Sequence, residues 1–245
     1  MNDQTIKISK AVLEALGIRK EQETEGKKPI RLGTNHEDLM DASKIASVIQ
    51  RSFCGHDGYP GTFRRLLSLI MQHLKTKHRH KLSNSVAGCM ATCLKDFEFS
   101  DTNTLRDLFK TNIDVVTDLE RNQMTVYIPA LCPIVDITRK KESREANLCF
   151  KLLGLEGGTL RRQLSLKHFG PIDMGASRHH AIQVSFELQQ MHHPVYFLAV
   201  EIEYLNSDGK DPGYVNLRER GMRIVEVVGS VGRAVGHWPL VVGGV

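Results

Sequence analysis

The chain has 245 residues, of which 41% are hydrophobic and 25% are charged, and its net charge is +5. This composition is typical of a globular protein that is long enough to bury a core. The sequence contains no run of about 18 apolar residues, which excludes a transmembrane helix. The N-terminus lacks the apolar core of a secretory signal, and the five cysteines have no framework spacing. We therefore expect reduced thiols and an intracellular protein, either cytoplasmic or nuclear.

The first 36 residues predict an arm joined to a linker. Residues 8–16 have apolar positions that suit a short helix, and Gly17 is a natural place for that helix to end. Residues 19–36 mix opposite charges with glycine and proline, which is typical of a flexible linker. The arm, residues 1–18, could dock on a neighbouring subunit or on the chain's own core, and a frayed terminus that packs locally is the third interpretation.

Residues 37–122 predict a helical subdomain. Four helices are expected, over Glu37–Phe53, from Thr62 onward, from Asn84 or Ser85 to Phe97, and from Ser100 or Asp101 to Leu119. In the second helix an apolar stripe lies opposite a polar face. The stripe contains Phe63, Leu66, Leu67, Ile70, Met71 and Leu74. The polar face contains Arg64, Ser68, Gln72, Lys75 and Arg79.

Residues 123–245 predict a β-rich subdomain, because the pattern changes at about Met124. Prolines 129 and 133 favour an edge strand or two short strands over residues 125–137, and residues 138–146 predict a charged loop. Further strands are expected over Leu148–Leu153, Leu160–His168, Arg223–Val228 and Leu240–Val242. A helical N-terminal half followed by an antiparallel β-rich C-terminal half is an α+β fold.

Two alternating runs in the β-rich half predict a hairpin. Apolar and polar residues alternate over Ile182–Leu188 and again over Tyr196–Tyr204, and a short break with Pro194 separates the two runs. This period of two is typical of half-buried strands, which would pair antiparallel across the break. Glu201 and Glu203 would then lie on the solvent-exposed face.

The basic residues are concentrated in one segment. Residues 51–81 contain seven Lys or Arg and a single acid, so this segment carries +6 and the rest of the chain carries −1. Such a surface attracts phosphate backbones or anionic lipid headgroups; a charged helix face that is merely solvated is the plainer interpretation. The candidate anion-binding residues are Arg64, Arg65, Lys75, Lys77, Arg79 and Lys81.

Other groupings of reactive residues favour ordinary structural roles. Four residues offer zinc ligands, namely His78, His80, Cys89 and Cys93. Their order is the reverse of a usual zinc finger, and the two cysteines also have the spacing of core residues. The histidine pairs at 179–180 and 192–193 would lie at opposite ends of the hairpin, too far apart to share a metal. No nucleophile elbow, P-loop or dinucleotide fingerprint occurs. We therefore predict no catalytic residue, metal or cofactor.

The sequence favours a non-enzymatic structural protein that forms a homo-oligomer and binds an anionic partner, either RNA or an anionic membrane surface. This layout is that of viral matrix, capsid and nucleic-acid-packaging proteins, an analogy of layout and composition alone. One alternative is a metal-dependent nuclease or other hydrolase, in which Asp136, with Glu201 or Glu203 and Lys140, holds a metal ion. The other is an intracellular adaptor whose β-rich half binds a peptide. No small-molecule substrate is inferred.

Overall fold

The computed structural model describes residues 36–55, 59–78, 93–140, 143–156, 160–189, 191, 194–206 and 220–229. The predicted arm lies outside these ranges, as do the predicted linker up to residue 35 and the predicted strand Leu240–Val242. The third predicted helix is described only at its end, where Cys93 and Leu94 are helical.

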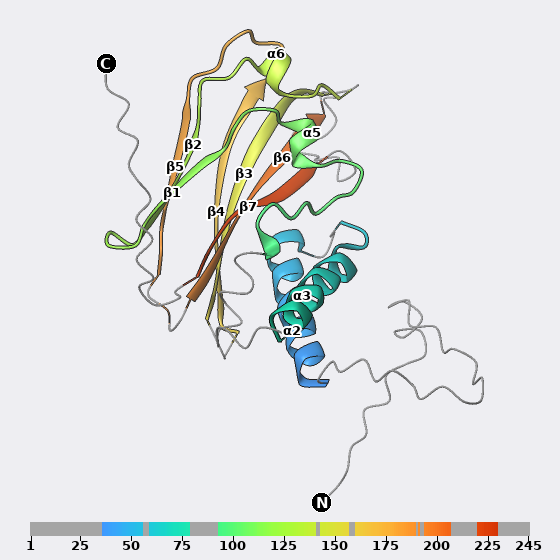
Figure 1. Ribbon diagram of the computed structural model, residues 1–245. Coiled ribbons are helices and arrows are strands. Elements are labelled where there is room, and N and C mark those ends of the chain that lie inside the picture. Colours follow the sequence, from blue (N-terminus) through green and yellow to red (C-terminus); the bar gives the residue numbers. More distant parts are fainter. Residues whose placement is uncertain are drawn as a thin grey trace, which may run out of the picture.

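The chain forms three layers, a β-sandwich with helices on one of its outer faces (Figure 1). The three-stranded sheet has the order β1 (Asp114–Asp118), β2 (Gln123–Ile128), β5 (Ile182–Glu187). The four-stranded sheet has the order β4 (Arg162–Asp173), β3 (Ser143–Glu156), β6 (Pro194–Asn206), β7 (Gly221–Gly229). All neighbouring strands are antiparallel. Helices α2 (His36–Cys54) and α3 (Thr62–His78) precede the sheets, so the predicted α+β class is confirmed.

The four-stranded sheet is buried on both faces. In β3, Leu148, Phe150 and Leu152 pack in the sandwich core, whereas Leu153 and Leu155 pack in the core under the helices. Strand β6 is buried without interruption over residues 195–202. A central strand covered on both faces has this nearly continuous apolar character rather than strict alternation.

The helical layer follows the predicted apolar stripe. In α3, Leu66, Leu67 and Ile70 are buried, and they share a core with Phe197 and Ile224 of the sheet. Phe63 and Met71 are partly buried against the same core. The amphipathic pattern of this helix therefore predicted its buried face correctly.

Residues 94–109 connect the helical layer to the sheet. The Asp96 amide donates to the Ile224 carbonyl at 2.8 Å and the Phe99 amide to the Met222 carbonyl at 2.9 Å, so this segment covers the outer edge of β7. A single helical turn follows, α5 (Leu105–Leu108), where the Thr104 hydroxyl accepts from the Asp107 amide at 3.1 Å as an N-terminal cap.

The fourth predicted helix is wrong beyond this turn. The chain continues from α5 into β1, which pairs with β2 through a tight turn at residues 119–122. Asp118 accepts from the amides of Glu120 and Arg121 in that turn, and Asn122 has a φ of +50°. The β-branched residues at 113 and 115–117 suit this strand, and the polar turn residues provide its reversal.

The predicted hairpin between the two alternating runs is also wrong. Strand β5 pairs with β2 in one sheet, and β6 pairs with β3 and β7 in the other, so the chain crosses between sheets near Pro194. The strands themselves are present close to the predicted positions. Their pairing was misassigned because adjacency along the chain does not determine which sheet a strand joins.

Three further features of the β-rich half differ from the sequence prediction. Strand β3 begins at Ser143, inside the predicted charged loop of residues 138–146. Strand β2 lies in the centre of its sheet rather than at an edge, and Pro129 follows its last residue. A single-turn helix, α6 (Pro133–Asp136), occupies the second half of the predicted edge strand. The boundary between subdomains at 122/123 falls in the turn of the β1–β2 hairpin.

Candidate functional site on helix α3

Helix α3 is fixed at its N-terminal end by buried polar contacts. The Thr62 side chain is fully buried, and its hydroxyl lies 2.8 Å from the Tyr59 carbonyl and 3.0 Å from the Phe99 carbonyl. The Arg65 amide donates to the Gly61 carbonyl at 3.1 Å. These contacts, together with the buried apolar stripe, set which face of α3 points outward.

Arg65, one of the predicted anion-binding residues, has a structural role. Its guanidinium donates to the Glu98 carbonyl at 2.9 Å and also to the Phe99 carbonyl and the Asp101 carboxylate. It also lies 5.3 Å from the centre of the Phe97 ring. The side chain therefore holds α3 to the segment that covers β7, and we leave it out of the candidate surface. This role could not be predicted from a helical wheel, because the partners of Arg65 come from a distant irregular segment.

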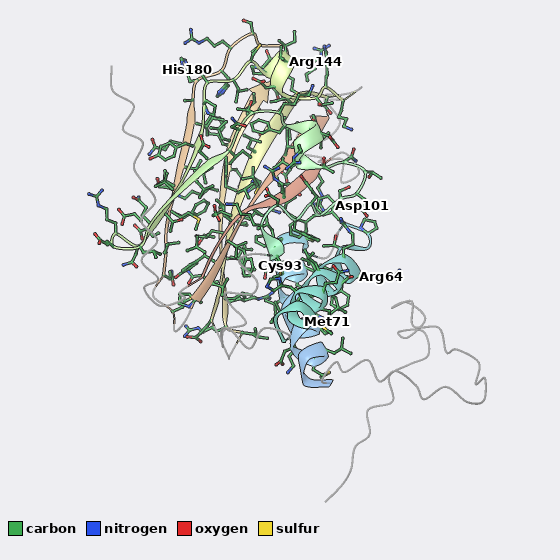
Figure 2. The ribbon with its side chains drawn as sticks, in the orientation of Figure 1. Arg64, Met71, Cys93, Asp101, Arg144 and His180 are labelled. Atoms are coloured by element: carbon green, nitrogen blue, oxygen red, sulfur yellow. The ribbon has the colours of Figure 1, made fainter. Side chains whose placement is uncertain are left out.

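The outward face of α3 is polar and basic. Arg64, Ser68 and Gln72 are exposed and lie along one stripe opposite Leu66 and Ile70. Figure 2 shows Arg64 on the outer side of the helical layer. The helix contains no acidic residue over its 17 positions. We call Arg64, Ser68, Gln72 and Lys75 the α3 stripe, since Lys75 occupies the next position of the same face at about 100° per residue.

The remaining predicted cations are only partly within the described structure. Lys75 and Lys77 belong to α3, but their side chains lie outside the described set. Arg79 and Lys81 are outside the described residues altogether. The structure therefore places the Arg64 side chain on the outer surface. For Lys75 it describes only the helical backbone.

A buried ion cluster lies between the helical layer and the sheet, and the sequence analysis missed it. Glu201, expected on a solvent-exposed face, is fully buried. One carboxylate oxygen lies 2.5 Å from the Lys151 amine, and the other accepts from the Tyr59 hydroxyl at 2.8 Å and lies 3.5 Å from Arg220. The Lys151 amine also donates to the Phe53 carbonyl at 2.9 Å. These contacts bind the end of α2 to strands β3 and β6.

The cluster shapes the electrostatics of its neighbours. Burial, followed by the charge of Glu201, raises the pKa of Tyr59 far above its usual range, so this hydroxyl remains a donor. The Arg220 guanidinium lies 4.7 Å from the centre of the Tyr59 ring. Burial, with a further contribution from Glu201, also raises the pKa of the Glu203 carboxyl. The sequence signal for the cluster was Lys151 inside an otherwise apolar strand, because a buried lysine requires a partner.

In the β-rich half, Cys149 and His168 lie close together but are not arranged as a nucleophile with its base. Cys149 Sγ lies 3.9 Å from His168 Nε2, and the Cys149 side chain is buried. Burial raises the pKa of the Cys149 thiol to about 12, so the reactive thiolate is disfavoured. The geometry gives the hydrolase alternative no support at this point.

The carboxylates of the nuclease alternative are engaged in separate contacts. Asp136 accepts from the Cys132 amide at 2.7 Å in the turn of α6, and Glu201 belongs to the ion cluster. The Lys140 amine donates to the Asn103 side chain at 3.2 Å. Within the described ranges, no group of three or more His, Cys, Asp or Glu side chains could hold a metal ion. Of the histidine and zinc candidates, His80, Cys89 and the pair at 192–193 lie outside those ranges.

Comparison with known proteins gives no family. No protein-family model and no curated protein matches the chain. A solved structure from work on CC2D1B in the mitotic reformation of the nuclear envelope is 8% identical, and the match covers 78% of this chain and 86% of that chain. Its TM-score of 0.19 is too low to indicate a shared fold, so this likeness carries no argument. Among the described helices, none has the length and apolar character needed to cross a membrane.

Proposed function

We propose that this chain is an intracellular structural protein that self-associates and binds RNA through the α3 stripe. The observation that carries the proposal is the exposed polar stripe of α3, which starts at Arg64, continues through Ser68 and Gln72 and is free of acids. Arginine, lysine, serine and glutamine side chains all donate hydrogen bonds to phosphate oxygens. The stripe therefore suits contact with a nucleic-acid backbone.

The burial of the apolar face supports RNA rather than a membrane as the partner. A helix that binds a lipid surface inserts its apolar face among the acyl chains. In α3 that face is committed to the protein core through Leu66, Leu67 and Ile70. The outward face offers charge and hydrogen bonds without aromatic side chains, so binding would be directed to the phosphates with little preference for base sequence.

The division of the chain supports the class of proteins suggested by the sequence. A helical layer carries the basic surface, and it packs on the outer face of a β-sandwich. We propose the class of viral matrix, capsid and nucleic-acid-packaging proteins by analogy with this layout alone.

The proposal is tested by charge reversal on the stripe. We expect Arg64→Glu/Lys75→Glu to fold normally by circular dichroism and to bind single-stranded RNA at least about tenfold more weakly at low salt, equivalent to ~1.4 kcal/mol. The matched control is Arg121→Glu/Arg144→Glu, which reverses two exposed cations of the sandwich. Arg144 lies at the end of the sandwich away from Arg64 (Figure 2).

Three outcomes decide between the alternatives. Loss of RNA binding in the stripe variant but not in the control supports the proposal. Equal losses in both variants, or none in either, would contradict it. Loss of binding to vesicles containing phosphatidylserine, with RNA binding unchanged, would assign the stripe to a membrane surface instead.

A further inference from the structure

Among the described residues, none pairs with the outer edge of β4, whereas the opposite edge of the same sheet is covered. Residues 96–99 bond to the backbone of β7 on its outer side. Strand β4 pairs with β3 on one side, and on its other side no backbone hydrogen bond reaches residues 162–169 from any described residue. An unpaired edge presents amide and carbonyl groups that another strand can bind.

The side chains of β4 leave this edge accessible. Leu164 and Leu166 are 37% and 51% exposed, and they lie on the face of the sheet that the helices cover elsewhere. Lys167 points the other way, where its amine donates to the Ser185 carbonyl at 2.6 Å and lies 5.4 Å from the centre of the Phe186 ring. The Lys167 charge therefore contributes to the contact between the two sheets and does not oppose the pairing of another strand with the β4 edge.

The regular part of β4 is short. Its pairing with β3 is continuous from Arg162 to Phe169, and the register shifts at Gly170 and Pro171. Proline lacks an amide donor, so the ladder on the outer edge ends there as well. The regular stretch of β4, residues 162–169, thus has eight residues, and Leu166 lies near its middle.

We propose that the β4 strands of two copies of this chain pair antiparallel about a two-fold axis at Leu166, which joins their four-stranded sheets into one. This inference rests on the self-association in the proposed function and identifies the surface through which two copies would associate. A two-fold axis perpendicular to the sheet keeps each side chain on its own face of the sheet, so only residues on the same face can lie opposite each other. The axis must therefore pass beside one residue that lies opposite its own copy, and we call this residue the centre.

Charge and polarity select Leu166 among the possible centres. With Leu166 opposite itself, Lys167 faces Ser165, His168 faces Leu164, and no like charges are opposed. A centre at Lys167 would place two lysines opposite each other, and a centre at Ser165 would place two serines at the axis, rather than the exposed Leu166 of both copies. Like charges directly opposite in a ladder are unfavourable. The selected register also brings the exposed Leu164 and Leu166 of both copies into one apolar strip.

Crosslinking tests this register directly. Residues directly opposite in an antiparallel pair have Cα atoms about 4.5–5.5 Å apart, within the range of a disulfide. Leu166→Cys should therefore form a disulfide-linked dimer on mild oxidation. Leu164→Cys is the matched control, because the two copies of residue 164 would lie roughly 13 Å apart. Wild type oxidised in parallel gives the background from the native cysteines.

Mass measurement tests the surface independently of any crosslink. By light scattering after size exclusion, we expect wild type to be dimeric or larger. Leu166→Lys, which opposes two charges at the axis, should halve the mass. Leu119→Lys, at a side chain that is 60% exposed in the β1–β2 turn, should keep the wild-type mass.

The outcomes separate this inference from the proposed function. If wild type is oligomeric but Leu166→Lys leaves its mass unchanged, or residue 164 crosslinks as well as residue 166, the β4 interface is wrong while self-association stands. If wild type is monomeric at the concentrations of the assay, both the interface and self-association are contradicted, and the open edge is left to a strand of another protein.

Discussion

At the scale of single residues, Glu201 is the centre of the contacts that hold the helical layer to the sheet. Its carboxylate lies between Lys151 and Arg220 and accepts from Tyr59, and all four side chains are buried. Removal of one member of a buried ion pair leaves the other charges without compensation. The residue that the nuclease alternative assigned to a metal ion is therefore a structural anchor.

The first prediction follows from this cluster. Glu201→Gln keeps the size of the side chain but removes the Glu201 charge from beside the buried Lys151 and Arg220. We expect the free energy of unfolding to fall by about 3–5 kcal/mol in urea denaturation. Glu187→Gln, an exposed position on β5, should change it by less than ~0.5 kcal/mol. A loss below ~1 kcal/mol for Glu201→Gln would show that the cluster is not the anchor.

The second prediction concerns pH and Glu203. Burial and the nearby Glu201 charge raise the pKa of this carboxyl above its ordinary value of 4.5, so the folded chain disfavours its ionised form. The Glu203 contribution to stability therefore falls as the pH rises from about the ordinary value through the folded-state pKa. Glu203→Gln removes this penalty.

We accordingly expect Glu203→Gln to have a higher urea midpoint than wild type at pH 7, and the difference should disappear as the pH is lowered below the ordinary value. Glu187→Gln is again the control. A difference that is constant across the pH range would mean that ionisation of Glu203 is not its cause.

At the scale of elements, β7 and α5 meet through a glycine. A Cβ atom at Gly221 would lie 2.8 Å from the Asn103 carbonyl oxygen and 2.8 Å from a methyl group of Leu108. The carbonyl belongs to the backbone and cannot move without shifting the segment before α5. This close approach fixes the start of β7 against the connection from the helical layer.

Gly221→Ala should therefore destabilise the fold by roughly 1–3 kcal/mol, the usual range for overpacking. Gly175→Ala is the matched control, since its Cβ would meet only the Asp173 side chain at 3.3 Å. Urea midpoints of the two variants should differ clearly. Equal midpoints would contradict the tight packing of β7 on α5.

The sequence predicted local structure better than it predicted pairing. The apolar stripe of α3 and the positions of β5 and β6 could be derived from periodicity, because a period of 3.6 or 2 is a local property. The partners of β5 and β6 could not, because they depend on segments that lie far away along the chain. The sequence predicts a helix where β1 forms, because Ile113 and Val116 also fit a helical stripe.

The same contrast between local and long-range properties applies to the candidate site. Arg64 and its neighbours on the outer face of α3 could be predicted from the helical wheel. The structural role of Arg65 and the burial of Glu201 could not, since each depends on contacts with segments distant in sequence. In the sequence, Glu201 and Glu203 alternate with apolar residues, which is typical of a solvent-exposed strand face. The sequence does not show that the helical layer covers this face of β6.

At the scale of the whole molecule, the four-stranded sheet belongs to two cores at once. One face packs in the sandwich with the three-stranded sheet, and the other packs under α2 and α3. This arrangement places helix α3 on one side of the molecule (Figure 1), while the open β4 edge lies at the border of the shared sheet. A dimer through β4 would carry two basic helices, which would give a polyanion two points of attachment.

The central claim is that the α3 stripe binds phosphates, and the salt dependence of RNA binding measures this most directly. For a single strand, the logarithm of the affinity falls linearly with the logarithm of salt concentration, with a slope of about −0.7 per phosphate neutralised. We predict a clearly negative slope for wild type and a slope smaller in magnitude by roughly 0.7 for Arg64→Gln, with the slope unchanged for Arg144→Gln. A wild-type slope near zero, or an Arg64→Gln slope equal to that of wild type, would contradict the account.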